Sequence, residues 1–231
     1  MEGNLTRFVT IVATLLVALS AHSAPPAGDR PTESATASLV AAGTVEIESG
    51  VAWRNDRFAV PFMLKVGIGG IFEPRVGIDL AAHPGVGPEL LFGFKLRGFR
   101  TSTVALSFLG AATVPVGEES PRYGTVRALL DITPANLSAY FGVNVGLNVD
   151  WRDGTRFAVP VSVVAGVNPA KRVAVFLEGA VTLSDEEAAW IVNFGLGYLL
   201  TPHMVLDLNV GWDLPREVPF VNAGFTLNFG S

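Results

Sequence analysis

The stretch YFGVNVGLNVDW, from Tyr140 to Trp151, decides the fold. Its odd-numbered positions are all apolar, and its even-numbered positions hold tyrosine, glycine, asparagine and aspartate. Successive side chains of a β-strand point to opposite faces. The stretch therefore predicts a strand with one apolar face and one polar or small-residue face.

The same alternation recurs along the chain, most clearly in 204–213 and 89–97. We expect strands near 44–53, 57–69, 74–80, 89–98, 103–114, 124–132, 138–151, 157–167, 173–183, 189–200, 204–213 and 219–229. Most are close to the roughly 9–11 residues that a tilted transmembrane strand needs. Their number, twelve, is even, as in bacterial barrels that begin and end on the same side of the membrane.

The composition favours strands that face lipid. Hydrophobic residues make up 49% of the chain, charged residues only 16%, and the mean hydropathy is +0.43. After the N-terminus, no uncharged apolar run reaches the roughly 18 residues expected of a membrane-spanning helix. The predicted fold class is therefore all-β: a closed antiparallel transmembrane β-barrel of about twelve strands.

The N-terminus has the pattern of a secretory signal peptide. Arg7 precedes an apolar stretch from Phe8 to Leu19, and small residues follow up to Ala24. The alternative is a buried first helix. We predict a signal peptide over residues 1–23, a flexible periplasmic segment over 24–42, which is rich in Pro, Ser, Thr and Ala, and the barrel over 43–231. Export through this signal predicts location in the bacterial outer membrane of a Gram-negative-type cell.

Proline marks four of the predicted short turns. These dipeptides are Glu73-Pro74, Thr133-Pro134, Asn168-Pro169 and Thr201-Pro202. Proline presets a turn's backbone angle and is excluded from paired central strands. With both termini in the periplasm, these connections are expected on the periplasmic side, where barrels keep their turns short.

The tryptophans predict a membrane-interface girdle. Each lies at the apolar phase of its strand and at the expected outer rim: Trp53, Trp151, Trp190 and Trp212. Tryptophan prefers the lipid–water boundary because its ring is apolar and its N–H needs a partner. The alternative is a set of scattered core aromatics.

Charged residues within the predicted strands take the phase opposite to the apolar face. The lumen-lining candidates are Lys65, Arg75, Asp79, Glu89, Lys95, Arg97, Arg127, Asp131, Glu178 and Asp207. A salt-bridge network that neutralises buried charge is one interpretation. A polar constriction that selects dipolar or zwitterionic solutes is the other.

The residue inventory disfavours catalysis. The chain has no cysteine and three histidines, His22, His83 and His203, which fall in the signal peptide, an outer loop and a turn. None lies on an inward strand face beside a nucleophile, so we expect no enzyme, no catalytic residue, no cofactor and no metal site. A net charge of −5 also disfavours nucleic-acid binding.

The last predicted strand alternates Val221, Ala223, Phe225, Leu227 and Phe229 with polar or small residues. It resembles the terminal strand that the outer-membrane assembly machinery recognises, although Gly230 and Ser231 follow its aromatic residue. Other expected partners are outer-membrane lipid, lipopolysaccharide near the acidic loops, and a small-molecule solute.

Several motifs recur at the strand starts and ends: GTVEIE at 43–48, VGI and EPRVGID within 66–79, TVPVG at 113–117, and the closing pair LDLNVGW at 206–212 and VNAGF at 221–225. In these motifs the chain resembles the outer-membrane proteins of the "MetA-pathway of phenol degradation" type. The resemblance covers nearly the whole chain after the signal peptide. It implies a strand-rich barrel and passage of small hydrophobic or aromatic compounds, and it brings no catalytic residues.

The function expected from the sequence is an outer-membrane channel or facilitator that passes small solutes through a narrow polar lumen. The alternative is a structural or surface-interaction barrel with a plugged lumen and no transport activity. A membrane-embedded enzyme and a secreted soluble β-sandwich or lipocalin-like carrier are further rivals.

Overall fold

The computed structural model describes residue 29 and residues 34–55, 57–81, 87–116, 123–135, 137–151, 155–185 and 188–230. The predicted signal peptide, the loop that holds His83 and the acidic pair Glu118-Glu119 lie outside the described residues. The described residues contain no helix long and apolar enough to cross a membrane.

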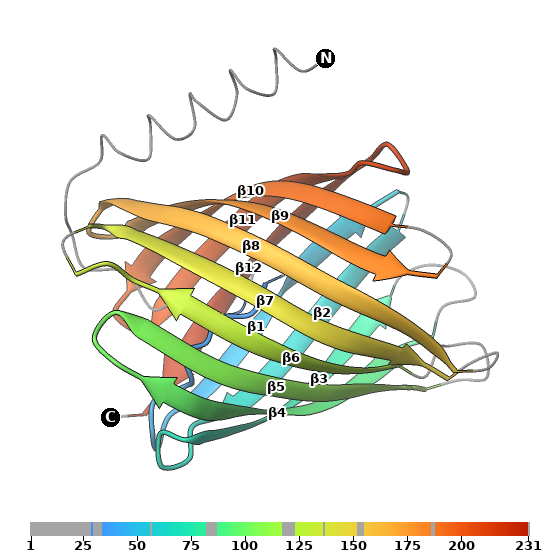
Figure 1. Ribbon diagram of the computed structural model, residues 1–231. Helices are drawn as coiled ribbons and strands as arrows, with labels where there is room; N and C mark the ends of the chain where they lie inside the picture. Colours follow the sequence, from blue (N-terminus) through green and yellow to red (C-terminus); the bar gives the residue numbers. More distant parts are fainter. Residues whose placement is uncertain are drawn as a thin grey trace.

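The described residues form twelve antiparallel strands that close into a barrel (Figure 1). The strands are β1 (Val45–Arg54), β2 (Arg57–Val66), β3 (Phe72–Ala81), β4 (Glu89–Arg100), β5 (Val104–Pro115), β6 (Tyr123–Ile132), β7 (Ala139–Asp150), β8 (Arg156–Ala170), β9 (Val173–Ser184), β10 (Ala188–Thr201), β11 (Met204–Asp213) and β12 (Val218–Phe229). Each strand pairs with its sequence neighbours, and β1 pairs with β12 to close the ring. The predicted fold class and strand number are confirmed.

The two ends of the barrel differ in their connections. At the end where Val45 begins and Phe229 finishes, called here the terminal end, the strands join through short turns such as the Lys171-Arg172 turn between β8 and β9. At the opposite end, called the loop end, lie the connections after β1, β3, β5, β7, β9 and β11. This division follows the predicted alternation of turns and loops.

Two predicted proline turns are wrong. Pro74 lies inside β3 and Pro169 inside β8, whereas Pro134 and Pro202 lie between strands as expected. The β2–β3 register begins only at Lys65–Arg75, one residue after Pro74. The β8–β9 register shifts between Val167 and Ala170. Each proline therefore lies where one neighbouring strand is not paired with it. The missing proline N–H breaks no strand–strand hydrogen bond on that side.

The outward face of the barrel is apolar. Large apolar side chains that remain exposed alternate with buried polar ones, as on β4, where Phe92, Phe94 and Leu96 flank the buried Lys95. A barrel that exposes its apolar residues outward and buries its charges inward matches a lipid environment. This arrangement places the polar chemistry in the lumen.

Candidate functional site: the barrel lumen

The lumen contains part of the chain's own N-terminus. Asp29 and residues 34–44, together called here the N-terminal segment, contact inward-facing side chains of β1 to β9, and the blue trace is visible inside the barrel in Figure 1. The sequence predicted a flexible periplasmic stretch at 24–42. Residues 34–42 instead lie in the lumen, because its polar side chains satisfy their backbone groups.

The middle of the N-terminal segment binds the walls of β6 to β9. The Ser34 hydroxyl donates to a carboxylate oxygen of Glu178, and the Ser34 N–H donates to the same oxygen at 2.6 Å. The Ala35 N–H donates to Asn144 Oδ1 at 2.8 Å. The Asp131 carboxylate accepts from the Thr36 hydroxyl at 2.6 Å and from the next backbone N–H at 2.7 Å. Three strands, β6, β7 and β9, thus supply acceptors to consecutive residues of the N-terminal segment.

Small apolar residues complete the contact. Ala35 and Ala37 are buried against Leu109 of β5 and Leu129 of β6, and Leu129 has no exposed surface. Alanine leaves room for the backbone to approach the wall closely. The N-terminal segment therefore packs against the lumen as well as hydrogen bonding with it.

The N-terminal segment returns to the wall at β2 and β3 and continues into β1. The Val40 N–H donates to Glu73 Oε2 at 2.8 Å. Gly43 and Thr44 exchange backbone hydrogen bonds of 2.9 Å with Gly67. A Cβ atom at Gly67 would lie only 2.0 Å from the Ala41 carbonyl oxygen, so glycine is required for this close approach.

A cluster of buried charges lies near the terminal end. Lys65 of β2 contacts Glu48 at 2.7 Å and Glu46 at 3.1 Å, both on β1. Arg75 of β3 pairs with Glu73 on the same strand. These side chains are at most 9% exposed. Charges buried to this degree require partners, because an unpaired one costs several kcal/mol.

Asp29 joins this cluster from the N-terminal segment. Its carboxylate lies 3.0 Å from Lys65 Nζ, 2.9 Å from Arg75 Nη1 and 3.1 Å from Lys95 Nζ. Burial raises the pKa of this carboxyl, but the three cations outweigh that effect and hold the pKa well below its ordinary value. Asp29 is therefore ionised at neutral pH.

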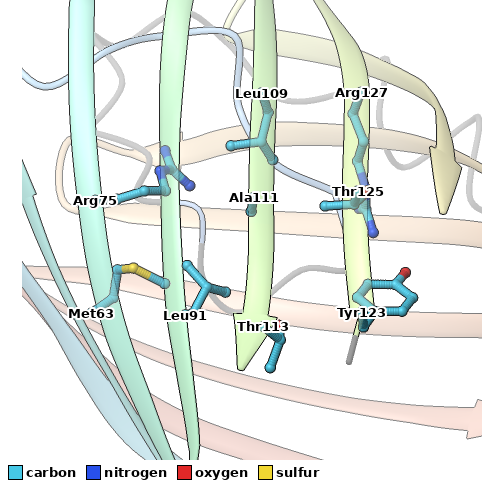
Figure 2. Close-up of a pocket in the computed structure, with 9 residues that line it drawn as sticks. All are labelled: Met63, Arg75, Leu91, Leu109, Ala111, Thr113, Tyr123, Thr125 and Arg127. Carbon is cyan, nitrogen blue, oxygen red and sulfur yellow. The ribbon is translucent and has the colours of Figure 1, made fainter. Parts of the chain in front are cut away.

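A cavity of about 230 Å³ lies inside the barrel. Figure 2 shows its lining residues, which come from β2 to β6: Met63, Arg75, Leu91, Leu109, Ala111, Thr113, Tyr123, Thr125 and Arg127. Along β5, Ser107 binds the N-terminal segment and Thr113 lines the cavity. Leu109, between them, packs against the N-terminal segment and also lines the cavity. The N-terminal segment therefore forms the floor of the cavity.

The ten predicted lumen-lining residues fall into two groups in the structure. The structure brings Lys65, Arg75 and Lys95 together around Asp29, and it places Asp131 and Glu178 against the N-terminal segment. The remaining five are not part of that cluster: Arg127 lines the cavity, Arg97 lies towards the terminal end of β4, Asp79 and Glu89 are register partners at the loop end, and Asp207 is buried on β11.

Sequence reasoning missed Asp29, Glu73 and Asn144. Asp29 fell in the segment predicted to be flexible, and Glu73 was assigned to a turn because Pro74 follows it. The alternation within 140–151 did place Asn144 on the polar face, but nothing local indicated what it would bind. Its partner, Ala35, is 109 residues away in the sequence.

The four tryptophans all lie at the loop end. Trp53 and Trp212 are the next-to-last residues of β1 and β11, Trp151 directly follows β7, and Trp190 is the third residue of β10. Their side chains are 43–50% exposed. This position at one end of an apolar outer surface is the one that the interface girdle requires.

The described residues hold no group of three or more His, Cys, Asp or Glu side chains arranged for a metal ion. Of the histidines, His203 lies in the turn between β10 and β11. His22 and His83 fall outside the part of the chain that the structure describes.

A family of known sequences matches this barrel over almost its whole length. The family described as "Putative MetA-pathway of phenol degradation" matches residues 28–229. The chain belongs to this family. The match starts before Asp29 and so includes the N-terminal segment as well as all twelve described strands. The comparison with curated protein sequences found no match.

Solved structures with a similar fold include two porins. The KdgM porin aligns with a TM-score of 0.67 at 9% identity, covering 80% of this chain and 99% of its own. The NanC porin aligns with a TM-score of 0.64 at 8% identity, covering 79% of this chain and 98% of its own. A second KdgM structure, with a TM-score of 0.67 and 8% identity, was solved in complex with disordered oligogalacturonate. The barrel thus shares its fold with these porins.

Proposed function

We propose that this protein is an outer-membrane channel or facilitator that passes small solutes through its lumen. The observation that carries the proposal is the polar inward face: charged, amide and hydroxyl side chains line the barrel from Asp131 near the terminal end to Asp79 near the loop end. The cavity beside Leu109 gives a solute a place to enter from the loop end. The porin-like fold and the family support the same function.

The expected solute is small. The cavity volume of about 230 Å³ lies below the roughly 300–1,000 Å³ of typical small-molecule pockets. Its lining combines apolar side chains such as Met63 and Leu91 with the hydroxyls of Thr113 and Tyr123 and with two arginines. Such a mixed lining suits molecules that have both an apolar body and a polar group, which includes the hydrophobic or aromatic compounds that the family resemblance implies.

The location and partners follow from the same proposal. The signal peptide over residues 1–23 directs export, and the apolar outer face contacts outer-membrane lipid. The alternating strand that ends at Phe229 is the recognition element for the assembly machinery, and the loop end faces lipopolysaccharide. The lumen residues act by binding and positioning solutes, without chemistry on them.

The N-terminal segment favours a second candidate, a plugged structural barrel. Its contacts with Glu178, Asn144 and Asp131 span several strands and obstruct the lumen. Under the favoured function the N-terminal segment leaves its position to let solutes pass. Under the second function it stays bound.

Single-channel recording in planar bilayers tests these candidates, together with solute uptake by reconstituted vesicles. A channel predicts brief openings for the full chain and longer ones for a variant that lacks residues 29–42. The absence of conductance and uptake in both proteins, with the barrel fold verified by heat-modifiable gel migration, overturns the proposed function.

A further inference from the structure

The Asp29 carboxylate occupies a ready-made carboxylate site. Cations from three adjacent strands, Lys65, Arg75 and Lys95, lie 2.9–3.1 Å from its oxygens. Charge-assisted hydrogen bonds of this kind recognise the carboxylate itself rather than the residue that carries it. The carboxylate of a small molecule would satisfy the same three donors.

The strands balance the charge of the cluster without Asp29. Three cations, Lys65, Arg75 and Lys95, stand beside three carboxylates that belong to the strands. Lys65 contacts Glu46 and Glu48, and Arg75 contacts Glu73. Asp29 adds a fourth carboxylate to this part of the described lumen, from the N-terminal segment rather than from the wall. When Asp29 leaves, the charges of the wall residues balance. When a solute carboxylate binds in its place, the cluster again has the one extra negative charge that Asp29 supplies in the structure.

Lys95 connects the cluster to the rest of the N-terminal segment. Besides its contact with Asp29, its ammonium group donates to the carbonyl oxygens of Thr36 at 2.8 Å and Ser38 at 3.0 Å. Lys95 is 1% exposed, so it needs acceptors wherever the N-terminal segment lies. A carboxylate that takes the place of Asp29 supplies one and lowers the cost of releasing the N-terminal segment.

The cavity leads directly to this site. Arg75 lines the cavity and also binds Asp29, and Leu109 lines it and packs against the N-terminal segment. An apolar body next to Met63, Leu91 and Leu109 would place an attached carboxylate beside the Arg75 guanidinium. The cavity therefore fits an amphipathic carboxylate that approaches from the loop end.

We propose that small amphipathic carboxylates compete with Asp29 for the site formed by Lys65, Arg75 and Lys95, and that their binding releases the N-terminal segment from the lumen. The competition involves only the exchange of one carboxylate for another at the three cations. The release would open the lumen, and this last consequence rests on the proposed channel function.

A single introduced thiol tests the release. The chain has no cysteine, so Ser38→Cys gives one reporter within the N-terminal segment. The probe is benzoate, and benzamide is the matched neutral molecule of nearly the same shape. The detergent-extracted full chain is reacted with a polar thiol reagent. Benzoate should raise the modification rate at least fivefold and benzamide should leave it unchanged. Lys171→Cys, in the exposed β8–β9 turn, controls for a direct effect of benzoate on the labelling reaction.

Calorimetric titration with benzoate tests the competition itself. Asp29→Asn keeps the shape of the side chain but removes the competing charge. This variant should bind benzoate at least tenfold more tightly than the unmodified chain, because the site no longer has to exchange one carboxylate for another. Equal or weaker binding by Asp29→Asn overturns the proposal, and so does an equal effect of benzoate and benzamide on the Ser38→Cys reporter.

These measurements need no transport, so the two proposals fail separately. Benzoate-dependent release in a protein that never conducts contradicts the channel function and leaves the carboxylate site intact. If the protein conducts but benzoate does not release its N-terminal segment, the carboxylate site is contradicted and the channel function stands.

Discussion

Ser107 of β5 donates a hydrogen bond of 2.6 Å to the backbone carbonyl oxygen of Ala37. Both residues are almost completely buried, Ser107 at 0% and Ala37 at 2% exposure. The contact joins a strand in the barrel wall to a residue 70 positions earlier in the chain. It shows that the N-terminal segment is an internal part of the barrel and not a flexible stretch ahead of it.

Gly67→Ala should loosen the N-terminal segment. The new Cβ would lie 2.0 Å from the Ala41 carbonyl oxygen, so the backbone must move away from the wall. In the Ser38→Cys background, the thiol should react several times faster. Gly179→Ala is the matched control, because a Cβ there meets no atom within 4 Å. Equal rates in the two glycine variants would show that close packing at Gly67 does not hold the N-terminal segment.

Asp131→Ala should weaken the contact between the N-terminal segment and β6. The Thr36 hydroxyl and the Ala37 N–H both lose their acceptor, at a cost of about 1–3 kcal/mol for each group that stays buried and unsatisfied. We expect longer channel openings and faster modification of Ser38→Cys. Lys171→Ala, in an exposed turn, should change neither. Channel openings as brief as those of the unmodified chain would indicate that Asp131 does not help to close the lumen.

The pH dependence of the N-terminal segment should reflect Asp29. Its pKa is held well below the ordinary value of 3.8 by the surrounding cations. A carboxyl whose pKa is depressed in the bound state contributes stability above its ordinary pKa and loses it as pH falls through the depressed value. The Ser38→Cys thiol should therefore stay protected from pH 7 down to about pH 4 and become accessible only in stronger acid.

Asp29→Asn provides the comparison for this titration. The neutral side chain should abolish the acid-dependent step that belongs to Asp29 and leave the thiol more accessible at pH 7. A step of release between pH 5 and 7 that is present in the unmodified chain and absent from Asp29→Asn would contradict the depressed pKa.

The tryptophans should report the depth of the barrel in a bilayer. All four lie at the loop end with 43–50% of their surface exposed. Lipids brominated near the headgroup should therefore quench their fluorescence more strongly than lipids brominated near the bilayer centre. Trp190→Phe should lower the total fluorescence that lipids quench. The remaining tryptophans should still be quenched more strongly by headgroup-brominated lipids than by centre-brominated ones. Stronger quenching from the bilayer centre would contradict an interfacial girdle.

The sequence was sufficient to predict the strands because a lipid-facing barrel repeats one local rule. A period of two separates outward from inward side chains, and the strand β7 that contains Asn144 shows it over its whole length. The predicted start or end differs from the structure by at most three residues at every strand. The largest differences, at Val66 and Ala170, lie where β2 ends before its glycine turn and where β8 continues through Pro169.

The N-terminal segment could not be predicted in this way because its contacts are not local. Small residues such as Ala35 and Ala37 suit a flexible linker and equally suit a backbone packed against a wall. Its binding is specified by carboxylates and an amide on β6, β7 and β9, which lie 94–144 residues further along the chain. Alternation identifies those wall residues as inward-facing but does not identify what they bind.

The central claim is that solutes pass through the lumen when the N-terminal segment leaves it. The most direct measurement is single-channel conductance of the Ala37→Cys/Ser107→Cys double variant, whose two thiols are the only ones in the chain. After oxidation, with the cross-link verified by mass spectrometry, we predict no openings, and after reduction we predict openings like those of the unmodified chain. Equal conductance in the cross-linked and reduced protein would contradict the claim, and so would no conductance in either state.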